Sequence, residues 1–292
     1  MIYFCADDYG ISKESNLRIE QCLSHGILNK ISVLPNGEIT DFSEQLAETD
    51  AKISLHINLV EGFPLSEQKD IPLLVSDCGS FKHSFIGLLL LSYSNKRKQV
   101  EEQLYREICN QLGFWKKQMG EKETIYIDSH QHTHMIPLVF KTLLRAARDS
   151  GVAVKYLRIT EEPILPYILN PSLYFTYSVT GILKQWLLKV LSLANRKEIR
   201  KWNLTSTYFM GAMFSGKLTE KRIDKLLPHY VKLAEKHGKD IEIAFHPGYL
   251  KPGEKLISGH REGFEKFYHS PWRYKEFQTV MKMKEGHRNA LY

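Results

Sequence analysis

The chain is poor in cysteine and has no long uninterrupted apolar run, and each shortage excludes a class of protein. Its 292 residues include four cysteines, none of which shows the Cys-x-x-Cys spacing of structural zinc sites. So few thiols also argue against a disulfide framework and favour a reducing compartment. The most hydrophobic stretch, residues 172–194, contains Lys184 and Lys189. We therefore expect a core or dimer-interface helix there, which leaves a homodimer open, and no membrane span.

A signal peptide and a concentrated basic patch are also lacking. Residues 1–6 carry no basic side chain before Asp7, so we expect no signal peptide and a cytoplasmic location. The net charge of +7 is spread along the chain. The basic run at residues 96–98, for example, is followed at once by Glu101 and Glu102, as on a solvated helix face. We expect neither nucleic acid nor a membrane among the partners.

What the sequence does contain is an ordinary globular composition with alternating strand and helix patterns. With 43% hydrophobic and 25% charged residues, the chain can bury a full core. Short apolar runs predict strands, and capped segments with helical spacing predict helices. The predicted strands are residues 2–6, 30–34, 53–59, 124–127, 152–158, 205–210 and 241–245, and the predicted helices are 12–25, 96–119, 138–150 and 219–237. The alternation predicts one α/β domain over residues 1–292, a distorted (β/α) TIM-like barrel of seven parallel strands.

Two segments depart from this alternation. Residues 61–95 predict a long loop with a short apolar segment near 85–91. Residues 163–203 are rich in proline and aromatic residues, and we interpret them as an insertion or cap within the barrel. We expect both segments to form walls of a substrate groove, because sugar rings pack on aromatic side chains. The aromatic residues available for this packing are Phe63, Tyr167, Tyr174 and Trp186.

The most informative stretch is residues 128–134, Asp-Ser-His-Gln-His-Thr-His, which follows the predicted strand 124–127. Ligands bind at this end of the strands in α/β folds. If the backbone stays extended, His130, His132 and His134 share one face. Three imidazoles and a carboxylate are costly to gather unless a metal or a proton transfer uses them. A polar loop with solvated histidines is the simpler alternative.

Other predicted strands carry similar polar residues near their ends. Asp7 and Asp8 follow the first strand, His56 lies in the third, and His246 follows the last. Two imidazoles and one carboxylate form a ligand set for catalytic zinc or another divalent ion. Adjacent aspartates are not expected to point to one place, so one could bind the metal while the other acts as a base. Taken singly, His56 also fits a satisfied core histidine, and the aspartates fit a helix-capping turn.

Four of these stretches together resemble the motifs of the YdjC-like family, which includes chitooligosaccharide deacetylases. The stretches are residues 6–12, 54–59, 128–134 and 246–248, and they occur in the family's order across nearly the whole chain. The resemblance implies a distorted barrel that removes the N-acetyl group from an amino sugar or an oligosaccharide. The chain departs from the family pattern at Tyr9, where phenylalanine is more frequent, and in its aromatic insertion.

The resemblance also implies a role for individual residues. Asp8, His56 and His130 match the family's metal ligands, and Asp7 matches its catalytic base. Such a donor set would accept one divalent ion, magnesium or zinc. Amide hydrolysis needs a nucleophilic water, which loses a proton to a base, and a leaving nitrogen, which gains a proton from an acid. We expect His246 to donate the proton to the nitrogen.

Three further residues are expected to support this chemistry. Arg158 ends a predicted strand and could hold Asp7 or bind substrate, with a surface ion pair as the alternative. His132 and His134 are expected to orient the ligands or contact substrate.

Other functions stay open on the sequence. A metal-dependent phosphoesterase or a cyclic amidohydrolase also uses a histidine-rich barrel, although amidohydrolases tend to carry His-x-His on the first strand. A non-catalytic carbohydrate-binding protein is a third alternative, but binding alone does not require the free carboxylate of Asp7 beside a metal.

Overall fold

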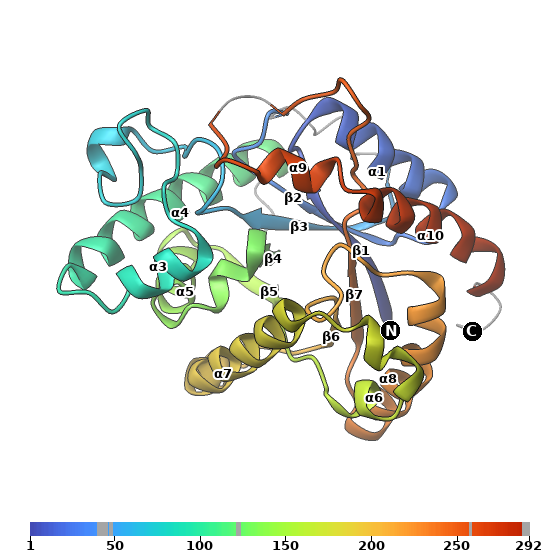
Figure 1. Ribbon diagram of the computed structural model, residues 1–292. Coiled ribbons are helices and arrows are strands. Elements are labelled where there is room, and N and C mark those ends of the chain that lie inside the picture. The colour runs from blue at the N-terminus through green and yellow to red at the C-terminus, as the bar shows by residue number, and fades with distance from the viewer. Residues whose placement is uncertain (40–45, 47–48, 121–123, 257–258, 288–292) are drawn as a thin grey trace.

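The computed structural model describes residues 1–39, 46, 49–120, 124–256 and 259–287 (Figure 1). At its centre is a seven-stranded sheet in the order β5-β4-β3-β2-β1-β7-β6, in which every paired strand is parallel. The strands are β1 (Ile2–Tyr9), β2 (Lys30–Val33), β3 (Lys52–Ile57), β4 (Thr124–Ser129), β5 (Ala153–Leu157), β6 (Tyr208–Met210) and β7 (Ile241–Phe245). The predicted α/β fold with seven parallel strands is confirmed.

The sheet curls like a barrel, but the described strands do not close the hydrogen-bond ladder between β5 and β6, which form its two edges. Side chains and one backbone bond span this gap instead. The Tyr156 hydroxyl lies 3.0 Å from Oγ1 of Thr207, and the amide of Phe209 donates to the carbonyl of Glu161 at 3.0 Å. The fold is therefore a distorted barrel that is open along one seam.

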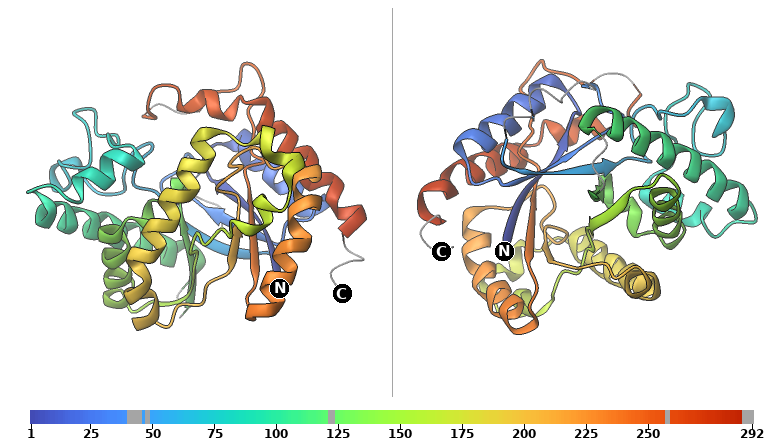
Figure 2. Two further views of the ribbon diagram at one scale, coloured as in Figure 1. Left: turned by 60° about the horizontal axis from the view of Figure 1, so that its bottom comes forward. Right: turned by 180° about the vertical axis from the view of Figure 1, so that it is seen from behind.

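Helices surround the curled sheet (Figure 2). They are α1 (Lys13–His25), α3 (Phe85–Leu91), α4 (Arg97–Met119), α5 (Pro137–Asp149), α6 (Leu165–Ile168), α7 (Val179–Lys201), α8 (Glu220–His237), α9 (Phe264–Tyr268) and α10 (Pro271–His287). Shorter 3₁₀ turns are η1 (Gln68–Asp70), η2 (His130–Met135) and η3 (Pro171–Thr176). The four predicted helices are confirmed, and capping explains one start: the Ser12 hydroxyl accepts a bond from the amide of Ser15 at 3.1 Å.

The two segments that broke the predicted alternation contain structure of their own. Residues 61–95 include η1 and α3, and α3 is the expected apolar segment. Residues 163–203 include α6, η3 and the long helix α7. One side of α7 is buried against the barrel, where Asn195 donates to the carbonyl of Met135 at 2.8 Å. Within the described residues, no helix combines the length and the apolar character needed to cross a bilayer.

Candidate active site

A cavity of about 590 Å³ opens where several strands end. Most of its polar lining comes from the four motif stretches, with Thr180, Lys184 and Ser215 added from elsewhere, and its apolar lining comes mainly from α3, α7 and α9. The lining residues are Asp7, Asp8, His56, Phe85, Ile86, Ser129, His130, Gln131, His132, Thr180, Leu183, Lys184, Leu187, Leu188, Ser215, His246, Phe264 and Phe267. A concave site with a polar floor and apolar walls is typical of small-molecule binding.

Both aspartates at the end of β1 line this cavity. In a regular strand they would point to opposite faces. However, the register of β1 against β2 shifts between Ala6 and Tyr9, and Asp8 has a φ of 71°. This irregularity turns the strand so that Asp7 and Asp8 share the cavity, and the expectation that they diverge is wrong.

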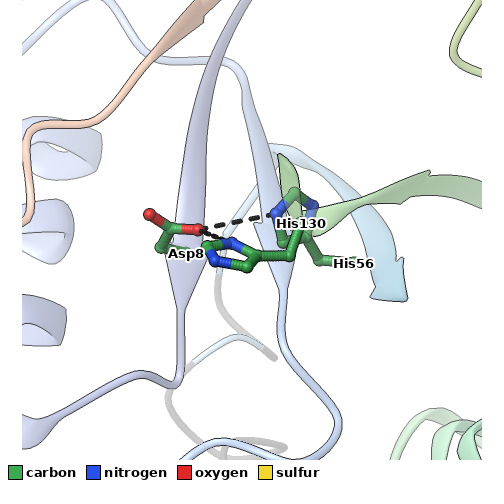
Figure 3. A group of neighbouring side chains, drawn as sticks. All are labelled: Asp8, His56 and His130. Carbon is green, nitrogen blue, oxygen red and sulfur yellow. Dashed lines mark hydrogen bonds and ion pairs between the residues drawn. The ribbon is translucent and has the colours of Figure 1, made fainter. Parts of the chain in front are cut away.

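Asp8, His56 and His130 come together from three strand ends (Figure 3). Oδ1 of Asp8 lies 2.8 Å from Nδ1 of His130 and 3.5 Å from Nε2 of His56. All three side chains are nearly fully buried. Burial alone would raise the pKa of Asp8, but His130, His56 and Arg273 stabilise the anion and hold that pKa well below its usual range.

Two members of this cluster, Asp8 and His56, are oriented by residues outside it. Oδ2 of Asp8 accepts bonds from the Tyr268 hydroxyl at 3.0 Å and from Arg273 at 2.9 Å, which leaves Oδ1 for the imidazoles. Nδ1 of His56 donates to Asp128 at 2.6 Å, so Nε2 faces Asp8. Burial lowers the pKa of His56, but the bond to Asp128 and the charges of the neighbouring aspartates outweigh it and raise the pKa to about 9.

The donor set fits a divalent metal ion. One carboxylate and two imidazoles are a ligand set of catalytic metal sites with open positions, and outer partners orient Asp8 and His56 as such sites require. Nδ1 of His130 faces Asp8, and its Nε2, on the other side of the ring, is buried without a hydrogen-bond partner among the described residues.

Two neighbouring groups of potential ligands fit a metal less well because cations already occupy them. Cys5, Asp128 and Glu242 form one such group, and Asp7, His56 and Asp128 form the other. Lys30 lies 2.7 Å from Glu242 and 3.4 Å from Asp128, and Arg158 lies 2.8 Å and 3.1 Å from the same carboxylates. A second positive ion in either group would face these cations at close range.

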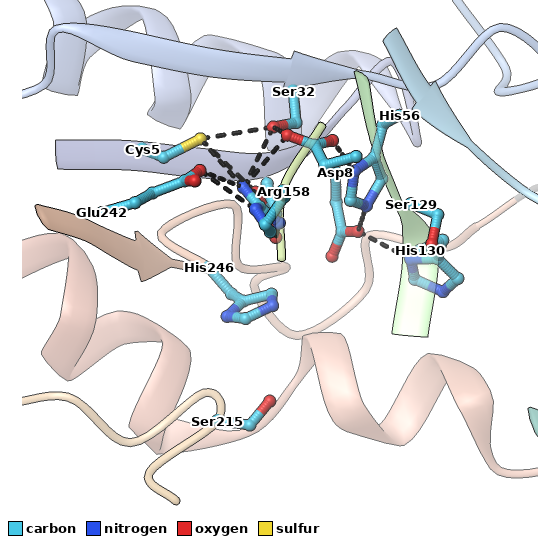
Figure 4. Close-up of polar contacts among 12 residues, drawn as sticks. Cys5, Asp8, Ser32, His56, Ser129, His130, Arg158, Ser215, Glu242 and His246 are labelled. Atoms are coloured by element: carbon cyan, nitrogen blue, oxygen red, sulfur yellow. Dashed lines mark hydrogen bonds and ion pairs between the residues drawn. The ribbon is translucent and has the colours of Figure 1, made fainter. Parts of the chain in front are cut away.

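Arg158 is fully buried, so an exposed surface ion pair is ruled out. Figure 4 shows its guanidinium group beside Glu242 and Cys5. Its two terminal nitrogens donate to the two oxygens of Asp7 at 2.7 and 2.8 Å. Burial alone would raise the pKa of Asp7, but Arg158 outweighs it and holds that pKa well below its usual range. Arg158 is absent from the described cavity lining, so its contact is with Asp7 and not with the cavity space.

The histidine-rich stretch is not extended. After His130 the chain turns through η2, where Gln131 and His132 adopt left-handed φ values of 53° and 60°. The three imidazoles therefore do not share a face, and that expectation is wrong. A spacing of two residues cannot reveal this turn, because it fits an extended strand equally well.

His132 and His134 consequently lie in different places. His132 lines the cavity beside Phe209, and burial holds its pKa well below the usual range. His134 lies outside the lining and donates from Nε2 to the carbonyl of Arg158 at 2.6 Å. Its Nδ1 accepts from the Ser129 hydroxyl at 2.5 Å. His134 thus ties the end of β4 to the end of β5.

His246 lies on the side of the cavity opposite His56 and His130 (Figure 4). Its backbone amide donates to Glu276 at 2.6 Å, and its Nδ1 lies 3.8 Å from the same carboxylate. The turn after it packs tightly: a side chain at Gly248 would begin 2.0 Å from Oγ of Ser15 on α1. Glycine at this position lets the turn hold His246 at the cavity.

The cavity walls come from both segments that the sequence predicted, residues 61–95 and 163–203, but the residues that line the cavity differ from the predicted ones. Phe85 and Ile86 of α3 line the cavity, as do Leu183 and Lys184 of α7. The proposed stacking residues Phe63, Tyr167, Tyr174 and Trp186 are all absent from the described lining. Tyr167 is a buried core residue whose hydroxyl donates to Glu162 at 2.6 Å. The aromatic rings at the cavity are Phe85, Phe264 and Phe267.

Several important contacts of the site are not predicted by the sequence analysis. Tyr268 and Arg273 approach Asp8 from the C-terminal helices, and no local pattern marks residues that lie over 250 positions away. The sequence gives only a weak indication that Asp128 is the partner of His56, namely that both lie near the ends of predicted strands. In the structure the two residues pair in register on β3 and β4. In the sequence Lys184 only interrupts an apolar run, whereas in the structure its ammonium group donates to Ser215 at 3.1 Å beside the cavity.

Comparison with known proteins agrees with this geometry. A family model described as YdjC-like protein matches residues 1–284. The chain is similar to a protein from Enterococcus faecalis V583, described as a candidate cellobiose-phosphate cleavage protein, with a TM-score of 0.67 and 18% identity over 99% of this chain and 94% of that chain. It is also similar to an uncharacterized protein from Agrobacterium tumefaciens C58, with a TM-score of 0.50 and 8% identity over 99% and 84% of the two chains. At these sequence identities the two similar structures support the fold assignment alone.

Proposed function

The chain belongs to the YdjC-like family, and from that premise we propose that it is a metal-dependent hydrolase that removes the N-acetyl group of an amino sugar or of an oligosaccharide containing one. The observation that carries the proposal is the Asp8, His56 and His130 cluster with the separate carboxylate of Asp7 in the same cavity. A metal held by the three residues would supply charge that polarises the acetyl carbonyl and acidifies water.

The reaction splits one amide bond with one water molecule. The water oxygen bonds to the acetyl carbon, the bond from that carbon to nitrogen breaks, and the products are acetate and the free amine. One proton must leave the water and one must reach the nitrogen, because an amide nitrogen leaves poorly as an anion. A base that takes the proton from water and an acid that protonates the nitrogen meet these two needs, and the cavity offers a candidate for each.

Asp7 is the proposed acceptor of the water proton. Arg158 holds both oxygens of Asp7, which keeps this side chain ionised and fixes its direction. The roles of the two aspartates are separated by their partners: Asp8 bonds to the imidazoles of the cluster, whereas Asp7 bonds to the guanidinium of Arg158.

His246 is the proposed donor of the proton to nitrogen. It lies across the cavity from the histidines of the cluster, so a substrate between them could have its carbonyl near the cluster and its nitrogen near His246. Glu276 holds this residue at the cavity: its carboxylate accepts from the backbone amide of His246 at 2.6 Å and lies 3.8 Å from Nδ1.

The test is acetate release from an N-acetylglucosamine oligomer, compared with phosphate release from p-nitrophenyl phosphate. We expect acetate only, and we expect it to stop after chelation and to return with added zinc or magnesium. Phosphate release without acetate would favour a phosphoesterase and overturn the proposal. Sugar binding without either product would favour the non-catalytic alternative.

A further inference from the structure

The outer face of α7 is apolar and uncovered. Six of its hydrophobic side chains are between 37% and 73% exposed, and their spacing of three, four and seven positions puts them on one side of the helix. They are Val179, Ile182, Leu183, Trp186, Val190 and Leu193. Figure 2 (left) shows α7 running across the front of the molecule with no other element of the described chain in front of it. Large exposed apolar faces mark interaction surfaces.

Basic side chains border this face and continue it toward the end of α7. Lys189 lies 5.8 Å from the ring of Trp186. Beyond Leu193 the exposed positions become cationic, and the exposed basic residues of the helix are Lys189, Arg196, Lys197, Arg200 and Lys201. A helix with an apolar face that includes tryptophan and with flanking Lys and Arg is typical of segments that lie in the surface of an anionic membrane.

The apolar face continues into the mouth of the cavity. Leu183 is 63% exposed and also lines the cavity, so it belongs to both surfaces. On the α3 side, Ile86 is likewise both exposed and part of the lining, and the exposed Leu90 lies one turn further along α3. The mouth is thus flanked by apolar side chains from two helices.

We propose that the exposed apolar face of α7, together with Ile86 and Leu90 of α3, docks the protein on an anionic lipid surface. The substrate is then an N-acetylated sugar that is anchored in that lipid. The substrate class rests on the proposed deacetylase function, whereas the docking surface does not. The expectation that no membrane is among the partners is revised accordingly: the protein lies on the membrane surface and no part of it needs to span the bilayer.

A second copy of the chain fits this surface less well. Two parallel α7 helices in contact would bring their clustered cations together, and α7 carries one acidic residue, Glu198, to offset them. In an antiparallel pair the cations of each helix would lie against the apolar turns of the other. A protein that covered Leu183 and Ile86 would also cover the cavity mouth, whereas a lipid surface would present a substrate to it.

The experiment measures co-sedimentation of the full chain with phosphatidylcholine vesicles, with and without phosphatidylglycerol. We expect binding to the anionic vesicles that weakens as salt is added. The double variant Trp186→Gln, Leu193→Gln, whose positions do not line the cavity, should bind these vesicles at least about tenfold more weakly. Leu17→Gln is the matched control, because Leu17 is 50% exposed but lies on α1. Equal melting temperatures would show that the variants fold.

Acetate release is measured in parallel from an N-acetylglucosamine lipid in the vesicles and from a soluble N-acetylglucosamine oligomer. The double variant should lose rate on the lipid and keep its rate on the oligomer. Absence of vesicle binding by the native chain, or equal binding by the double variant, overturns the docking surface. A dimer that the double variant dissociates, without vesicle binding, overturns it in favour of a second copy.

The two proposals fail in distinguishable ways. If vesicle binding depends on Trp186 and Leu193 but neither substrate releases acetate, the deacetylase function and the substrate class are overturned while the docking surface stands. If the oligomer releases acetate and vesicles are not bound, the deacetylase function stands and the docking surface is overturned.

Discussion

At the scale of single residues, backbone strain is concentrated at the cavity. Three of the four non-glycine residues with positive φ in the described chain, Asp8, Gln131 and His132, line it. Three imidazole nitrogens of the lining, Nε2 of His130 and Nδ1 of His132 and of His246, are also buried without hydrogen-bond partners among the described residues. Backbone strain lowers stability, so its concentration in one place indicates a functional site.

The first prediction concerns His246. An amide nitrogen needs a proton to leave, whereas the phenolate of p-nitrophenyl acetate leaves unaided. His246→Ala should therefore lose about 10²–10⁴-fold in kcat on the N-acetyl sugar and far less on the ester. His229→Ala, at a half-buried position on α8 outside the cavity lining, is the control. Equal losses on both substrates would show that His246 is structural or stabilises the oxyanion.

A second prediction concerns Lys184, whose charge the cavity wall partly buries. Burial lowers its pKa from 10.5 to about 8, although Glu162, Asp7 and Asp8 act in the opposite direction. The unfolded chain therefore holds this proton more tightly, so the destabilising effect is full below pH 8 and disappears above pH 10.5.

Lys184→Met should accordingly raise the free energy of unfolding at pH 7, and the gain should shrink as the pH rises through that window. Urea unfolding at several pH values measures it. Lys189→Met, an exposed position on the same helix, should show no such trend. A gain for Lys184→Met that does not change with pH would mean that its ammonium group is well solvated in the folded state.

At the scale of elements, regular structure could be predicted from the sequence but its irregular ends could not. The start of α1 at Ser12 and the end of α4 before Gly120 follow from local capping rules. The bulge at Asp8 and the turn η2 follow from how neighbouring strands and helices pack, which no short window of sequence contains. These irregular ends are the parts that aim the site residues.

The element-scale prediction concerns the first turn of α7, which forms part of the cavity wall. The Ser178 hydroxyl caps it by accepting from the amide of Gly181 at 3.1 Å. Ser178→Ala should cost about 1 kcal/mol of local stability. Because Thr180 and Lys184 would then be held less firmly, KM should rise several-fold with little change in kcat. Ser178→Asp, which restores the cap, should restore KM. An unchanged KM in Ser178→Ala would remove this turn from the binding site.

At the scale of the whole molecule, the candidate site depends on contacts across nearly the full length of the chain. Asp8 on β1 is held by Tyr268 and Arg273 near the C-terminus, and Asp7 is held by Arg158 from β5 across the barrel. From the sequence, the parallel strands imply that their ends meet, which places Asp7, Asp8, His56, His130 and His246 at one edge of the sheet. The choice of Asp8, His56 and His130 as metal ligands rests on the family resemblance. The supporting residues could not be grouped in this way, because strand order and the packing of α10 are properties of the complete fold.

The central claim is that Asp8, His56 and His130 hold one divalent metal ion, while Asp7 is not a ligand and acts as a base. The most direct test is the metal content of purified protein, measured by elemental analysis. The native chain and Asp7→Asn should each carry about one metal ion, although Asp7→Asn should lose most turnover. His56→Ala, His130→Ala and Asp8→Asn should each lose the metal. Full metal content in both histidine variants, or exchanged behaviour of the two aspartate variants, would contradict the account.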